Sequence, residues 1–168
     1  MANKHIVCIT DAMSGTDVRT DIQCGKYFYN DLTFMDIDNG RFLKIDKLIN
    51  RNMYKLVPAE DTTPIDQLAL VASPEFLPDP RYQCLDDFYN PAGEAIRFYR
   101  LKPHDKFSLS KLGFLTTPKV GDKAFLSKGS PSSLSTATTT SSDTTAIGEI
   151  IDAFILGGIQ FYTVEVGK

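Results

Sequence analysis

Few residues in this chain have a type and spacing that could carry out chemistry. The sequence holds two histidines, His5 and His104. His104 precedes Asp105 next to a strand-like run, and neighbours on a strand point to opposite faces, so they would not form a catalytic dyad. A solvated turn residue is the simpler interpretation of His104. Ser14 precedes a glycine, but the G-x-S-x-G pattern of an exposed nucleophile is missing.

The sequence also lacks the spacings that usually hold metals or phosphates. It has no H-x-x-x-H, H-E-x-x-H or paired Cys/His pattern, and neither of the common glycine-rich phosphate loops. Asp36 and Asp38 resemble the start of a calcium loop, but the glycine comes one residue early and Lys47 occupies the twelfth position. Asp86-Asp87 is more typical of a solvated loop or helix cap than of an acid pair. We therefore expect no metal, no cofactor and no enzymatic activity.

Composition narrows the class of protein further. The net charge is −3 without a strongly basic run, so the electrostatic footprint of a nucleic-acid binder is missing. No apolar stretch approaches the roughly 20 residues that cross a bilayer, and the N-terminus is too weakly apolar for a signal peptide. The odd set of three cysteines, Cys8, Cys24 and Cys84, favours reduced thiols in a protein made in a cytosol.

The elements that must position any site are expected to be strands. The stretch "TFMDIDNGRFLKI" contains two β-rich runs joined by Asn39-Gly40. Asn-Gly is the preferred pair for a type I′ turn, so we expect a β-hairpin with these two residues at its tip.

Other short apolar runs follow at regular intervals. "KFSLS" alternates strictly, with Phe107 and Leu109 on one face and Ser108 and Ser110 on the other, as in a half-buried strand. Gly157-Gly158 is expected to form a tight turn between two strands. Further strands are expected at residues 53–59, 67–73, 95–101, 123–126, 146–152 and 159–166.

Two segments are less regular. Residues 44–52 fit a short helix, or a strand followed by a turn. Residues 74–93 contain four prolines and several aromatic residues. They predict a long ordered loop with one helical turn near residues 85–89, because a disordered segment would hold few aromatic residues.

The Ser/Thr-rich tract "SPSSLSTATTTSSDTT" lies between strand-like runs. Threonine suits a pleated surface, so "LSTATTT" fits an edge or surface strand and "SSDTT" the turn after it. The alternative is a flexible linker, which would leave the last two strands as an isolated hairpin that is marginal in water.

Together these patterns predict an all-β fold: a small β-barrel or β-sandwich with long ordered loops and little helix. We expect residues 1–35 to form an N-terminal arm or the first strands. Residues 36–112 would form the β-rich main part, and residues 113–168 a C-terminal β-subdomain packed on it.

The order of several motifs resembles a known family. "VGDKAFLSKGS", "LSTATTT", "AIGEIID" and "FYTVEV" follow one another as in the C-terminal part of tailed-phage head decoration (capsid cement) proteins. Upstream, "NGRFLKI", "YKLVPA", "LALVASPE" and "AGEAIRFYRLKPHDKFSLS" resemble the N-terminal part of that family in the same order. The resemblance covers most of residues 36–166 and does not extend to residues 1–35.

The resemblance implies a structural virion protein that binds the outer surface of an assembled phage capsid and stabilises it. It implies the major capsid protein as the partner, leaves room for further copies of this chain, and places the protein on the virion after synthesis in the host cytoplasm. The alternative is a β-sandwich that binds carbohydrate or a protein partner in a virion fibre, with aromatic residues of the 74–93 loop stacking on sugars.

The N-terminal segment offers a candidate capsid-binding stretch, formed by Ile6, Val7, Cys8, Ile9 and Thr10. The surrounding residues are too polar to form a core of their own, and a β-branched stretch can add a strand to an open sheet edge of a neighbouring subunit. The alternative is that these residues form the first strand of the protein's own barrel.

Overall fold

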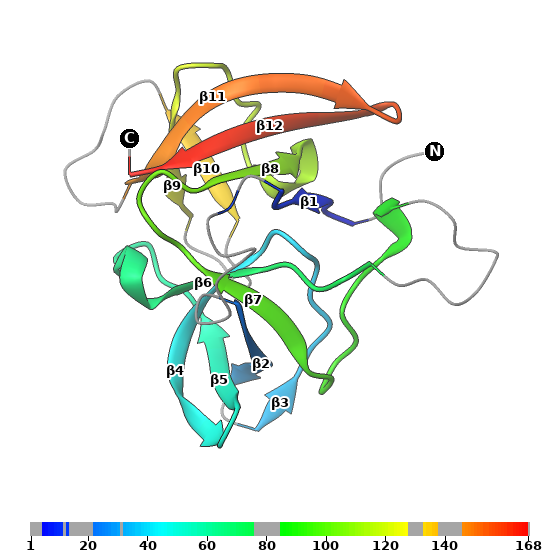
Figure 1. Cartoon of the computed structure of the whole chain (residues 1–168), viewed down its shortest axis with the longest axis vertical. Helices are drawn as coiled ribbons and strands as arrows, with labels where there is room; N and C mark the ends of the chain where they lie inside the picture. Colours follow the sequence, from blue (N-terminus) through cyan, green and yellow to red (C-terminus); the bar gives the residue numbers. More distant parts are fainter. Residues whose placement is uncertain are drawn as a thin grey trace.

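The computed structural model describes residues 5–11, 13, 22–30, 32–75, 85–127, 133–137 and 146–167. Within these residues the chain is built from strands and three 3-10 turns. Two β-structures lie on top of each other, a barrel and a second sheet (Figure 1). The predicted all-β class is therefore confirmed.

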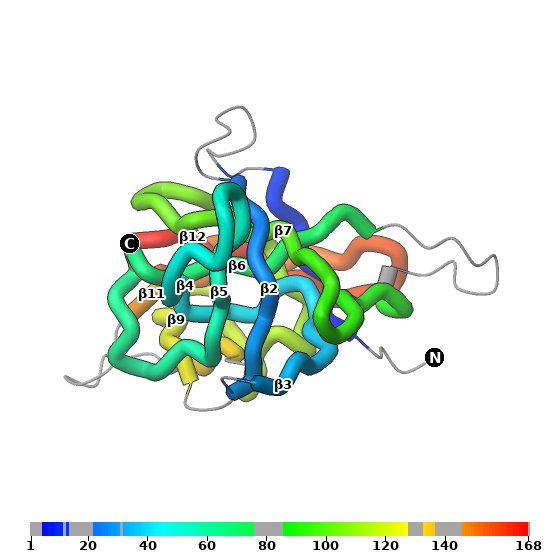
Figure 2. The backbone as a smooth tube through the Cα atoms, turned by 90° about the horizontal axis from the view of Figure 1, so that it is seen from below, coloured from blue at the N-terminus to red at the C-terminus, as the bar shows by residue number. Residues whose placement is uncertain are grey.

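The first structure is a closed five-stranded barrel, which we call the barrel. Its strands are ordered β2-β5-β4-β6-β7, and pairing of β2 with β7 closes it. Figure 2 shows β2 crossing the face of the barrel that points away from the second sheet. The barrel strands are β2 (Ile22–Asn30), β4 (Phe42–Asn50), β5 (Met53–Pro58), β6 (Leu68–Val71) and β7 (Ile96–Arg100), and β3 (Thr33–Phe34) extends β2.

The second structure is an open six-stranded sheet, which we call the upper sheet because it lies at the top of Figure 1. Its order is β1-β8-β12-β11-β9-β10, and all its pairs are antiparallel. The strands are β1 (Cys8–Ile9), β8 (Lys106–Ser110), β9 (Lys123–Leu126), β10 (Leu134–Ala137), β11 (Ala146–Leu156) and β12 (Ile159–Val166).

Strand β6 of the barrel contributes side chains to both hydrophobic cores of the protein. All four residues of β6 are buried. Leu68 and Leu70 belong to the larger core between the barrel and the upper sheet. Ala69 and Val71 belong to the smaller core inside the barrel. Because successive side chains of a strand point to opposite faces, one short apolar strand joins both cores.

Most predicted strands are present. The runs at 53–59, 67–73, 95–101, 123–126 and 159–166 correspond to β5, β6, β7, β9 and β12, and the run at 146–152 is the first part of the longer β11. Residues 44–52 form the end of β4 and a turn, not a helix. The helical turn predicted near residue 85 is the 3-10 turn η3 (Leu85–Asp87). Gly157 and Gly158 form the β11–β12 turn, both with positive φ, as predicted.

The predicted hairpin at Asn39-Gly40 is wrong. The run before it forms β3, which pairs with β2, whereas β4 pairs with β5 and β6. Asn39 does not have the positive φ that a type I′ turn requires, and only Gly40 has it, at 79°. Asn39 is instead buried, and its side chain bonds the backbone of a distant segment. The pairing of distant strands therefore determined the local structure, not the turn sequence.

The expectation that Ser108 and Ser110 face solvent is also wrong. Ser110 is fully buried, and Ser108 is 8% exposed. The hydroxyl of Ser108 bonds that of Thr163 on β12, and the Ser110 hydroxyl accepts a bond from the N-terminal segment. Both faces of β8 are therefore covered, which an alternating pattern alone does not reveal.

The sheets do not follow the three segments expected at 1–35, 36–112 and 113–168. The upper sheet takes β1 from the first segment and β8 from the second. The barrel takes β2 from the first. Within the Ser/Thr tract, residues 134–137 form β10 at the edge of the upper sheet, as predicted for a surface strand. The rest of the predicted strand and its turn, residues 138–145, lie outside the described residues.

Candidate functional site

The candidate stretch Ile6–Thr10 is part of this chain's own fold. Ile6 and Val7 are 2% and 1% exposed, and Ile6 belongs to the core between the two sheets. Cys8 and Ile9 pair with β8. The free-arm interpretation is therefore wrong for Ile6 and Val7, whose side chains are buried, and for Cys8 and Ile9, which pair with β8, although β1 is the edge strand of the upper sheet. The alternative was a first strand of the protein's own barrel; these residues do form the first strand of the fold, but β1 lies in the upper sheet and not in the barrel.

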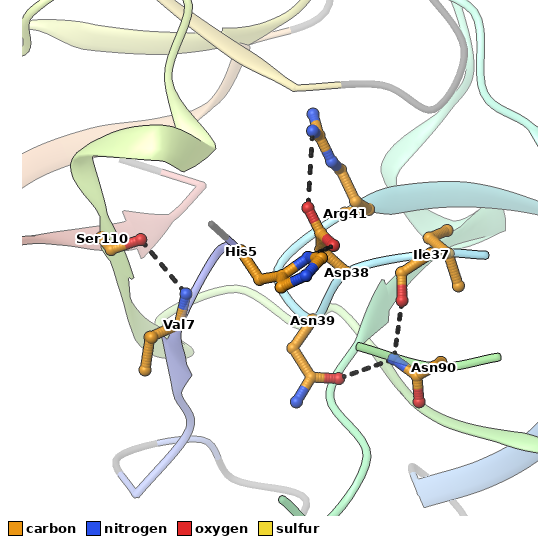
Figure 3. Close-up of polar contacts among 8 residues, drawn as sticks. All are labelled: His5, Val7, Ile37, Asp38, Asn39, Arg41, Asn90 and Ser110. Carbon is orange, nitrogen blue, oxygen red and sulfur yellow. Dashed lines mark hydrogen bonds and ion pairs between the residues drawn. The ribbon is translucent and has the colours of Figure 1, made fainter. Parts of the chain in front are cut away.

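A polar cluster holds the N-terminal segment against the barrel (Figure 3). His5 Nδ1 lies 2.7 Å from Asp38 Oδ1, and the His5 ring stacks on Tyr89 with a centroid separation of 5.2 Å. Arg41 Nη2 lies 3.8 Å from Asp38 Oδ2. The pairing of His5 with Asp38 was missed from the sequence because 33 residues separate them. These contacts join the N-terminal segment to the loop that precedes β4.

Asn39 and Asn90 complete this cluster on the barrel side. The Asn90 amide donates to the Ile37 carbonyl at 3.0 Å and to Asn39 Oδ1 at 3.1 Å (Figure 3). Asn39 Nδ2 donates to the Ser73 carbonyl, and the Ser73 N–H donates to Asn39 Oδ1, both at 2.9 Å. These bonds satisfy buried polar groups, so the cluster fixes the loops around residues 37, 73 and 90.

Burial changes the acidity of three groups around the cluster. It raises the pKa of the Cys8 thiol above its usual range, and the Glu75 carboxylate raises it further. Burial also raises the pKa of Glu75 itself, although a hydrogen bond with Asn39 acts in the opposite direction. Burial lowers the pKa of Arg41 against the influence of Asp38. A thiol with a raised pKa is a poor nucleophile, which argues against a reactive role for Cys8.

The other residues that suggested chemistry are held in structural contacts or lie apart. His104 is largely exposed, with its Nδ1 3.5 Å from a Glu165 oxygen, whereas Asp105 is buried and accepts a bond from the Lys102 N–H. Asp36 accepts a bond from the Ala92 N–H, so it braces a loop. Asp86 and Asp87 lie in η3. Cys8 and Cys24 are free thiols. Among the described residues, no group of three potential metal ligands is found. Ser14, Cys84, Phe76 and Tyr82 lie outside the described residues.

The β11–β12 hairpin is the most distinctive exposed feature. It extends past the end of β8 (Figure 1). β9 pairs with β11 only at residues 146–149, and β8 pairs with β12 only at residues 161–165. At its tip, Ile155 is 69% and Leu156 53% exposed. From Ala153 to Val164 the chain has no charged residue.

A second feature is an open cavity of about 380 Å³ at one mouth of the barrel. Its walls come from β4, β5, the 3-10 turn η2 (Ile65–Gln67) and β7. Sequence reasoning missed it, because the cavity depends on which strand ends meet at the mouth. The lining residues are Lys44, Ile45, Asp46, Tyr54, Asp66, Gln67 and Arg100.

Comparisons with known proteins identify no relative: no family model, no curated protein and no solved structure matches this chain. Among the described residues, no helix is long and apolar enough to cross a membrane.

Proposed function

We propose that this protein is a structural virion component that binds the outer surface of an assembled phage capsid and stabilises it. The order of its strand motifs resembles capsid decoration proteins. The observation that carries the proposal is the exposed apolar tip of the β11–β12 hairpin, which we assign as the contact with the major capsid protein. This hairpin replaces Ile6–Thr10 as the candidate contact.

The hairpin has the properties of a surface that a partner covers. Proteins normally protect exposed strand edges with charged residues, proline or short length. On the outer edge of β11 past residue 150, the protections are Asp152 and the register shift between Ile150 and Asp152, and residues 153–156 carry neither charge nor proline. Contiguous exposed apolar groups such as Ile155 and Leu156 are typical of interaction sites.

An open edge of this kind suits strand addition to a neighbouring subunit. Main-chain hydrogen bonds would supply affinity, and the alternating side chains Ala153 and Ile155 would supply specificity. A ligand that binds only the assembled, folded shell stabilises that shell by mass action. A decoration protein therefore needs a rigid body and a complementary contact, and it needs no reactive centre.

Co-sedimentation with empty capsids of the phage that encodes this chain tests the proposal. Wild-type protein is expected to saturate the capsids and to raise their melting temperature. Ile155→Lys places a charge on the exposed tip and should abolish binding without unfolding the protein. Val120→Lys is the matched control, because Val120 is also exposed, at 60%, and lies outside the hairpin.

The two parts of the proposal fail separately. If wild-type protein does not bind capsids, the function is wrong. If wild-type protein binds and Ile155→Lys binds equally well, only the assignment of the hairpin is wrong.

A further inference from the structure

We propose that Asn39-Gly40 is a self-modification site, which the folded chain keeps inactive and which reacts when the surrounding loops open. It is the one place in the sequence where glycine follows asparagine. Asparagine is a thermolabile residue, and a following glycine has no side chain to hinder attack on the asparagine amide. This inference does not rest on capsid binding and concerns a different part of the molecule from the hairpin.

The reaction needs only this residue pair and water. The Gly40 backbone nitrogen gives up its proton and bonds to Asn39 Cγ, the bond from Cγ to Nδ2 breaks, and ammonia leaves. Water then adds across one of the two carbonyl–nitrogen bonds of the resulting succinimide ring. The product is aspartate, or isoaspartate, in which the main chain runs through the former side chain.

In the folded chain the Asn39 amide is held away from this reaction. The residue is 1% exposed. Its Nδ2 donates to the Ser73 carbonyl at 2.9 Å, and its Oδ1 accepts bonds from the Ser73 N–H at 2.9 Å and from the Asn90 amide at 3.1 Å. Because Nδ2 is the leaving group and ring closure moves the whole amide, these bonds must break before ammonia can leave.

The attacking nitrogen is held as well. The Gly40 N–H donates to the carbonyl of the buried Val71 at 2.7 Å, so the proton that must leave is already bonded. Gly40 has a φ of 79°, and a Cβ atom at this position would lie 2.7 Å from a Leu109 methyl carbon and 2.8 Å from one of Ile6. The peptide is therefore packed against the core between the two sheets, which hinders the backbone rotation that ring closure requires.

Neither product can restore the native contacts. An aspartate at position 39 cannot donate to the Ser73 carbonyl, and it would place a second carboxylate beside Glu75, which accepts a bond from the Asn39 amide in the folded chain. An isoaspartate lengthens the main chain by one methylene between the Ile37–Asn90 bridge and β4. Opening of these loops, once followed by the reaction, is therefore irreversible.

Mass spectrometry of the peptide that contains residues 39 and 40 measures the reaction, because the product is heavier by the difference between water and ammonia. Native protein and protein unfolded in guanidinium chloride are incubated at the same pH and temperature. Since only open molecules react, the native protein should react at least about a hundredfold more slowly. Asn90→Ala removes one bond to Asn39 but keeps the reacting pair, so it should speed the native reaction about fivefold.

Asn52→Ala is the matched control, since it makes the same change in the exposed β4–β5 turn and should leave the native rate unchanged. Asn39→Asp, which is the product itself, should melt at a lower temperature than the wild type. The inference is overturned if native and unfolded protein react at the same rate, or if the unfolded chain does not react at Asn39. It is also overturned if Asn90→Ala reacts no faster than Asn52→Ala, or if Asn39→Asp melts like the wild type.

Discussion

Val7 and Ser110 exchange two hydrogen bonds between the N-terminal segment and the end of β8. The Val7 N–H donates to Ser110 Oγ at 3.1 Å, and the Ser110 N–H donates to the Val7 carbonyl at 2.9 Å. One serine thus binds through both its side chain and its backbone. This pair explains why the stretch around Val7 belongs to the fold and does not form a free arm.

Replacing Ser110 with alanine should destabilise the protein. The buried Val7 N–H would lose its acceptor, and a buried unsatisfied donor costs about 1–3 kcal/mol. Ser108→Ala in the same strand is the control. It should cost about 1 kcal/mol or less. The substitution leaves only the Thr163 hydroxyl without its partner, and the bond between the Ser108 and Thr163 hydroxyls is only partly buried. Urea unfolding measures both changes, and equal losses would contradict the role of the Val7–Ser110 pair.

Replacing Asn39 with alanine should cost more. Asn39 contacts the Ser73 backbone through two bonds and accepts a third from Asn90, so its removal leaves several buried groups without partners. We expect a loss on the order of 3 kcal/mol in the free energy of unfolding. Asn52→Ala, in the exposed β4–β5 turn, should change stability by about 0.5 kcal/mol or less. A loss at Asn39 no larger than at Asn52 would refute the role of the amide network.

The two described cysteines should differ in reactivity. Cys24 is exposed, whereas burial and the nearby Glu75 raise the pKa of Cys8. Since the thiolate is the reactive form, iodoacetamide should modify Cys24 before Cys8 at neutral and mildly alkaline pH. Peptide mass spectrometry of briefly treated native protein measures this order. Faster labelling of Cys8 would show that its thiol is not protected.

Glu75 should make stability depend on pH. Burial raises its pKa above the ordinary 4.5, so the folded protein holds this proton more tightly than the unfolded chain. The resulting stabilisation is present below pH 4.5 and is lost as pH rises through the raised pKa. As the pH rises from 4.5 through the raised pKa of Glu75, the free energy of unfolding of the wild-type protein should therefore fall relative to that of Glu75→Gln. Unfolding curves for both proteins across the interval provide the measurement, and a constant difference would disprove the effect.

Local patterns predicted the elements that depend on local chemistry. The apolar run that forms β6 and the Gly157-Gly158 turn could be placed from the sequence. A buried strand appears there as a run of apolar residues, and a turn with positive φ appears as glycine. β2 was expected only in general terms, as one of the first strands within residues 1–35, and its position was not predicted, although "KYFYN" within it has the aromatic residues of a strand. Its pairing with β5 is parallel and joins distant residues, and no local pattern specifies such a partner.

The failures at Asn39-Gly40 and Ser110 have a common physical cause. Asn-Gly favours a hairpin turn, and an alternating serine favours solvent, when no other part of the chain interferes. Here residues 73 and 90 bond Asn39, and residue 7 bonds Ser110. The same limit applies to the candidate sites. The exposed Ile155 lies in a run that reads as an ordinary strand, and the barrel mouth depends on the meeting of four separate segments.

A cryo-electron microscopy map of phage capsids saturated with this protein tests the central proposal most directly. The proposal predicts added density on the outer surface of the shell, with the β11–β12 hairpin against the major capsid protein and Ile155 in the contact. Capsids incubated with Ile155→Lys should lack that density, and those incubated with Val120→Lys should retain it. A map without added density after incubation with wild-type protein would contradict capsid binding. Density in which the hairpin points away from the shell would contradict the proposed contact.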